Sequence, residues 1–142
     1  MTDTAARFEV RVTSDSHFGW LRTRLAFERT LLAWMRTAAA LIGFGFTIVQ
    51  FFERFSEMQG VDEALRPQAP RYLGLALIGA GVLGLVISLW QYRKGVNYLW
   101  SADFRPIAGM NDDRMSAPSF AAAIVVLLIG LFAFGAIFLR FL

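Results

Sequence analysis

Three apolar stretches, each about as long as a bilayer core is thick, constrain this chain more than any other feature. They run over residues 33–52, 72–92 and 118–139, and about 20 apolar residues let an α-helix cross a hydrocarbon core of about 30 Å. Hydrophobic residues make up 56% of the 142 residues, whereas about 45 to 50% is usual in soluble domains. The sequence therefore predicts an all-α membrane protein with three transmembrane helices.

The segment before the first stretch is amphipathic. Ser16 is a candidate helix cap, and Phe18, Leu21, Leu25 and Leu32 follow at spacings of three, four and seven residues without an intervening proline. We expect an amphipathic N-terminal helix that leads directly into the first span. Residues 1–15 are predicted to be a flexible cytoplasmic tail, and residues 16–142 a single three-helix membrane domain. No apolar run lies near the N-terminus, so no cleaved signal peptide is expected.

Basic residues are distributed unevenly around the three spans. Ten of the fourteen lie on the N-terminal side of the first span, in its first turn, or between the second and third spans: Arg7, Arg11, Arg22, Arg24, Arg29, Arg36, Arg93, Lys94, Arg105 and Arg114. Because cytoplasmic loops carry an excess of arginine and lysine, this asymmetry predicts a cytoplasmic N-terminus and an outside C-terminus.

The two connectors are predicted to be short. The first, residues 53–71, contains four acidic residues and two prolines, which is typical of an exterior connector without a site of its own. In the second, apolar residues at helical spacing predict that helix two continues to about Ala102 and ends before Arg105-Pro106.

Three arginines recur every seven residues near the start of the first span: Arg22, Arg29 and Arg36. Seven residues turn an α-helix by about 700°, so these side chains form one line along it, with Glu28 beside them. Arg36 could lean back to lipid phosphates at the cytoplasmic edge. Alternatively, the line could surround an oligomer axis and bind phosphate-bearing or other anionic solutes, or it could pair with Glu28 of a neighbouring subunit or with a partner.

The second span carries small residues at every fourth position, and close helix packing in membranes uses such faces. These are Ala76, Ala80, Gly84 and Ser88, while Gly74 and Gly81 form a second small-residue strip. Packing among the three spans of one chain and self-association are both consistent with this pattern.

Residues that could support catalysis or metal binding are sparse. The chain has no cysteine and one histidine, His17, which is expected to be a surface residue. Asp112 and Asp113 are expected to be a solvated loop pair, and no glycine-rich phosphate loop follows a strand. We therefore expect no enzymatic activity, cofactor, metal or nucleic-acid partner.

The sequence from Leu25 to Thr37, LAFERTLLAWMRT, followed by LIGFG at 41–45, resembles the signature of the YidH-like family, small bacterial inner-membrane proteins with a domain of unknown function. The resemblance implies a multi-pass protein of the bacterial inner membrane. A related domain forms the membrane part of the eukaryotic vacuolar transporter chaperone complex, where several copies surround a basic path for polyphosphate. That relation implies a candidate role for Glu28, Arg29 and Arg36, although Phe27 stands where the family often has asparagine.

The first expected partner is the lipid bilayer. We expect a small integral membrane protein that either forms a homo-oligomer or packs against another membrane protein. The alternative is an oligomeric conduit or binding site for anions such as phosphate or polyphosphate, lined by Arg22, Arg29 and Arg36.

Overall fold

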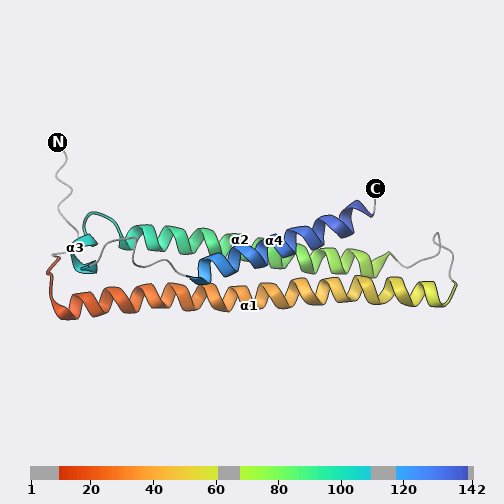
Figure 1. Cartoon of the computed structure of the whole chain (residues 1–142), viewed down its shortest axis with the longest axis horizontal. Coiled ribbons are helices and arrows are strands. Elements are labelled where there is room, and N and C mark those ends of the chain that lie inside the picture. Colours follow the sequence, from red (N-terminus) through yellow and green to blue (C-terminus); the bar gives the residue numbers. More distant parts are fainter. Residues whose placement is uncertain (1–9, 61–67, 110–117, 141–142) are drawn as a thin grey trace.

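The computed structural model describes residues 10–60, 68–109 and 118–140, and within these ranges every regular element is a helix (Figure 1). The helices are α1 (Ser14–Met58), α2 (Ala69–Leu99), α3 (Arg105–Ala108) and α4 (Pro118–Leu139). The helices α1, α2 and α4 are long and apolar enough to cross a membrane. The prediction of an all-α, multi-pass membrane protein is confirmed.

Helix α1 is much longer than a bilayer core is thick, because its 45 residues extend over about 68 Å. It begins with a capping box in which Thr13 Oγ1 accepts from the Ser16 amide and Ser16 Oγ accepts from the Thr13 amide. The cap is thus Thr13 rather than the expected Ser16. The amphipathic segment and the first span form one unbroken helix, as predicted, and the helix continues six residues beyond Phe52 to Met58.

Helix α2 starts with a proline in its first turn and ends at Leu99, three residues before the expected end. The Trp100 amide closes the last turn by donating to the Val96 carbonyl at 3.1 Å. The short helix α3 follows. Of the predicted tail, residues 1–9 lie outside the described residues, as do the parts of the two connectors at 61–67 and 110–117.

Helices α1 and α2 pack with their backbones in close approach at two glycine positions. A Cβ added to Gly45 would lie 2.7 Å from the carbonyl oxygen of Gly74, and one added to Gly81 would lie 3.0 Å from that of Ala38. Real Cβ atoms rarely come this close, so a larger residue at Gly45 or Gly74 would push the backbones apart. Small residues therefore fix how α1 and α2 cross.

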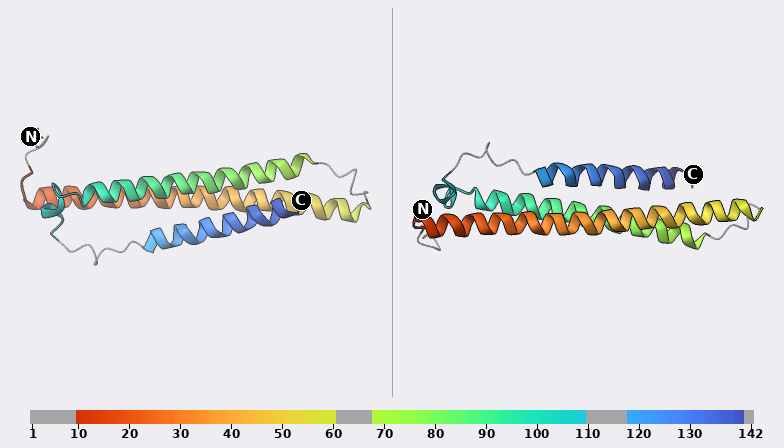
Figure 2. Two further views of the ribbon diagram at one scale, coloured as in Figure 1. Left: turned by 90° about the horizontal axis from the view of Figure 1, so that it is seen from above. Right: turned by 60° about the horizontal axis from the view of Figure 1, so that its bottom comes forward.

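Helix α4 lies along the α1–α2 pair (Figure 2). It completes two apolar clusters. One contains Ala123 with Leu31 and Leu85. The other contains Ala133 and Ile137 of α4 with Ile42, Val49, Ile78 and Val82 of the α1–α2 pair. We call the end where α1 begins, α2 ends and α4 begins the proximal end, and the opposite end the distal end.

Candidate functional site

The three arginines of the line on α1 lie on the face that is turned away from the rest of the molecule. Arg22, Arg29 and Arg36 are all exposed. The buried residues of α1, such as Leu31 and Ala38, lie roughly 180° around the helix from them at 100° per residue. None of the three arginines makes a hydrogen bond or ion pair with another residue in the described ranges. Their guanidinium groups are open to lipid, an anion or another protein.

Arg36 lies on α1, which is long and apolar enough to cross a membrane. Glu28 and Glu53 meet α4 at its two ends and are 25 residues apart, which is about 38 Å along a helix. A hydrocarbon core of about 30 Å, if centred between them, would place the Cα of Arg36 about 8 Å inside that core. A charged side chain at such a depth on a lipid-facing surface is unfavourable, so residues of this kind usually face protein or water.

Glu28 does not join the arginine line. Its carboxylate accepts a hydrogen bond from Ser119 Oγ of α4, Oε1 to Oγ 2.7 Å, and Ser119 is buried. Tyr92 of α2 is buried next to it, within electrostatic range of Glu28. The predicted site residues therefore do not form one group. Arg22, Arg29 and Arg36 lie on the exposed face of α1, whereas Glu28 points toward α4.

Arg24 was not singled out by sequence reasoning as a site residue, yet it is the most buried charged group in the described part of the chain, at 7% exposure. Its guanidinium lies 5.9 Å from the centre of the Trp20 ring, one helical turn away. Trp20 is buried as well, and its indole N–H donates to the Leu99 carbonyl at 3.0 Å. The spacing of Trp20, Arg24 and Glu28, each four apart, is a signal that could have identified this cluster.

His17 is half-buried and has a contact that the sequence did not indicate. Its Nδ1 lies 2.8 Å from the Ile107 carbonyl oxygen, an acceptor, so this nitrogen carries the proton. The contact ties the start of α1 to α3. A small apolar cluster lies where the start of α1 meets α3, and it contains Trp20, Leu99, Ile107 and Ala108. The histidine thus has a structural partner at the proximal end.

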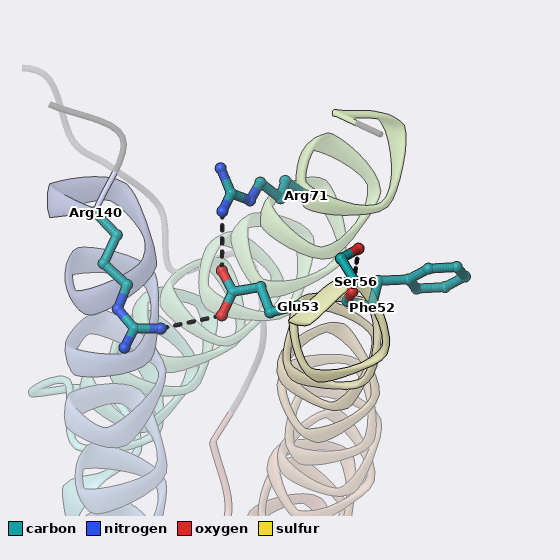
Figure 3. A network of polar contacts seen from close by, with 5 residues as sticks. All are labelled: Phe52, Glu53, Ser56, Arg71 and Arg140. Carbon is teal, nitrogen blue, oxygen red and sulfur yellow. Dashed lines mark hydrogen bonds and ion pairs between the residues drawn. The ribbon is translucent and has the colours of Figure 1, made fainter. Parts of the chain in front are cut away.

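A second polar group, also missed, closes the distal end of the bundle (Figure 3). Glu53 of α1 accepts from Arg71 of α2 at 3.4 Å and from Arg140, directly after α4, at 3.0 Å. The Glu53 side chain is 15% exposed and that of Arg140 is 66% exposed. The first and last residues of the connector predicted over 53–71 thus form an ion pair between helices, and the absence of a separate site in that connector stays a prediction.

The small residues of α2 lie in different surroundings. Ala76 and Ala80 are exposed, Ser88 is buried, and Gly84 faces Trp34, whose ring carbon Cζ3 would be 3.2 Å from an added Cβ. Within this chain the closest approach to α1 uses the second strip, which contains Gly74 and Gly81. Whether Ala76 and Ala80 contact another molecule stays a prediction.

The free face of α1 carries small residues beside the arginine line. Ala33, Ala40, Gly43 and Thr47 are exposed, and a Cβ added to Gly43 would meet no atom within 4 Å. In the part of α1 before Glu28, Phe18 and Leu25 are 55% and 51% exposed. This face therefore combines small, apolar and arginine side chains with no covering element in the described part of the chain.

Groups that could hold a metal ion are absent from the described residues, which contain no cluster of three or more His, Asp or Glu side chains suited to it. The pair Asp112 and Asp113 lies outside the described residues.

Comparison with known proteins gave one finding. The model of a family described as a domain of unknown function (DUF202) matches residues 22–98. This range covers the arginine line, Glu28, Glu53 and most of α1 and α2. No match was found among curated proteins or among solved structures.

Proposed function

Because the chain belongs to the DUF202 family, whose function is unknown, we propose a function from its own geometry: a non-enzymatic multi-pass membrane protein that self-associates through the free face of α1. The observation that carries the proposal is Arg36, a charged side chain exposed on that face of a helix that is long and apolar enough to cross a membrane. A neighbouring copy would remove this side chain from lipid.

The other residues of the face support the same proposal. The space beside Gly43 is open, so the monomer would accept a larger side chain there. Small residues in membrane helices allow a second helix to approach closely, which a glycine at this position would permit between copies. Phe18 and Leu25 precede Glu28 and so lie beyond the hydrocarbon, where lipid tails cannot cover them. Copies of one protein inserted in the same direction bring their α1 helices together in parallel, which places Phe18, Leu25 and Gly43 of two copies at matching heights.

We also place the protein in the bacterial inner membrane, with the proximal end in the cytoplasm and the C-terminus outside. The uneven distribution of arginine and lysine supports this orientation, since Arg22, Arg29, Arg93 and Lys94 all lie at or beside the proximal end. Bilayer lipids are then the first partners of the exposed apolar residues on α2 and α4. Nucleic acid is not a partner in this proposal.

The test of self-association is the native mass of the full chain in mild detergent and in nanodiscs. We expect a defined oligomer for the wild type and a monomer for Gly43→Leu, because the larger side chain keeps the α1 helices apart. Gly135→Leu is the matched control, since a Cβ added to Gly135 of α4 also meets no atom within 4 Å. A wild type that stays monomeric at every concentration, without crosslinked partners, would refute the proposal.

A second function is favoured by the arginine line itself: binding or conduction of anions such as phosphate or polyphosphate. Arg22, Arg29 and Arg36 are exposed and unpaired within the described residues, and guanidinium groups bind phosphate oxygens in a bidentate manner. In an oligomer, several such lines would repel one another unless anions lay between them. Anions would then be part of the assembled state.

Liposomes test this second function. We expect anion flux or polyphosphate binding for the wild type, and a loss of at least about tenfold for Arg29→Ala with Arg36→Ala, as two charge-assisted contacts disappear. Arg105→Ala removes an exposed arginine of α3 and should change nothing. Equal binding or flux in all variants would exclude the arginine line as an anion site, even if the oligomer forms.

A further inference from the structure

The helix α4 is held on the α1–α2 pair by polar contacts at its two ends and by apolar contacts between them. Ser119 bonds Glu28 at the proximal end, and Arg140 bonds Glu53 at the distal end. The middle contributes Ala123, Gly130, Ala133 and Ile137, all buried. Both glutamates are on α1 and lie on nearly the same side of it, 25 residues apart.

The two ends are anchored unequally. At the proximal end, Phe120 follows Ser119 and stacks on Tyr92 with ring centres 6.0 Å apart, while the Arg93 guanidinium lies 5.4 Å from the Phe120 ring. At the distal end, the described polar contact of α4 is the single pair of Arg140 with Glu53. Arg140 is two-thirds exposed there, so water and ions can compete for its guanidinium.

The apolar middle resists separation less than it would in water. Lipid tails are as apolar as Val49 and Ile78, so uncovering these residues in a bilayer loses packing contacts but no hydrophobic driving force. The α1–α2 pair differs, because its glycines bring two backbones together and a second bond, Arg71 to Glu53, also joins its distal ends. Polar contacts at the membrane edge therefore have a large share in positioning α4.

We propose that α4 is a hinged helix, fixed at Ser119 and Phe120, whose distal end is latched to the α1–α2 pair by the ion pair of Arg140 with Glu53. Opening of the latch swings the distal half of α4 away and exposes the apolar surface around Val49 and Ile78 to lipid or to another helix. The α1–α2 pair stays closed in both states. The latch responds to charge at the distal membrane surface.

Spin-label distance measurements in a bilayer test the hinge. The chain has no cysteine, so labels can be placed at exposed positions: Leu73 with Phe138 for the distal end, and Gln91 with Ala121 for the proximal end. Dilution with unlabelled protein removes distances between copies. For Glu53→Gln and for Arg140→Gln, we expect the population with a longer distal distance to rise about two- to fivefold, the range of an exposed ion pair. The proximal distance should not change.

Two controls separate a latch from a general loss of structure. Arg71→Gln removes the other partner of Glu53 and should leave α4 in place, because Arg140 still reaches Glu53. Glu57→Gln removes an exposed carboxylate one turn further along α1 and should have no effect. High salt should shift the wild type toward the open population but leave Glu53→Gln unchanged.

The proposal is overturned if the distal distance stays the same in both Glu53→Gln and Arg140→Gln, or if the proximal and distal distances lengthen together. An effect of Arg71→Gln as large as that of Arg140→Gln would also overturn it. If Glu53→Gln does not fold, the distal distance in Arg140→Gln and the salt dependence of the wild type still test the latch, since neither experiment alters the part-buried carboxylate of Glu53.

Discussion

Two faces of α1 use glycine in opposite ways. Gly45 is buried, and a Cβ there would lie 2.7 Å from the Gly74 carbonyl oxygen, whereas Gly43, two residues earlier, faces open space. The first glycine is explained by the fold of a single chain and the second is not. Glycine lowers helix stability relative to alanine, and Gly43 has no close neighbour in the monomer that requires a glycine. The proposed contact between copies would explain why a glycine stands there. The comparison separates residues that build the monomer from residues available for association.

The strongest way to break this comparison is to enlarge a glycine on each face. Leucine at Gly74 would collide with Val49 and with the Gly45 backbone, so we expect Gly74→Leu to lower the free energy of unfolding by about 3 kcal/mol or more. Gly43→Leu should instead raise it by about 0.5 to 1 kcal/mol, because leucine forms helix better than glycine and a Cβ there meets no neighbouring atom. Unfolding titrations in mixed micelles measure both. Equal destabilisation by the two variants would mean that the two faces do not differ as described.

The border between the two faces can be tested at Glu28 and Arg29, adjacent residues that point in different directions. Ser119→Ala removes the hydrogen bond to the Glu28 carboxylate, and a bond to a charged group contributes about 1.5 to 3 kcal/mol. We expect Ser119→Ala to lower the free energy of unfolding by about 2 kcal/mol in the same titration. Arg29→Ala should be nearly neutral, because Arg29 is exposed and unpaired within the described residues. A larger loss for Arg29→Ala than for Ser119→Ala would reverse the assignment of the border.

The fold could be predicted from the pattern of apolar residues. Three long apolar stretches predict the helices α1, α2 and α4, and the amphipathic segment without proline predicts the N-terminal extension of α1. The direction of single side chains was harder. Glu53 and Arg140 are 87 residues apart, and nothing in the sequence around either residue indicates the other. Ala76 and Ala80 are four residues apart and Gly74 and Gly81 seven, and either spacing puts both residues near one face of a helix. The crossing of α1 and α2 uses the glycines, where the two backbones come into contact. The direction of the arginine line likewise depends on which side α2 and α4 occupy.

Gly130 of α4 sharpens the comparison between backbone and side-chain neighbours. A Cβ there would meet Ile42 Cδ1 at 2.6 Å and Val82 Cγ2 at 2.9 Å, which are ends of side chains rather than backbone atoms. Because such ends can move and α4 can shift on its apolar surface, we expect Gly130→Ala to lower the free energy of unfolding by only about 1 kcal/mol. A loss as large as that of Gly74→Leu would show that α4 is as rigidly packed as the α1–α2 pair. It would also count against a hinged α4.

The smallest change, Gly43→Ala, distinguishes a lipid-facing glycine from one that contacts a second copy. Alanine forms helix better than glycine by up to about 1 kcal/mol in an exposed helix interior, and the monomer offers no clash at this position. The monomer should therefore become slightly more stable. If Gly43 packs against α1 of a neighbouring copy, the added methyl group keeps the two helices apart, and the dissociation constant in nanodiscs should rise by about tenfold or less while monomer stability is kept. A variant with both higher stability and unchanged association would assign Gly43 to lipid, and the contact between copies would then have to be sought on another face, such as that of Ala76 and Ala80.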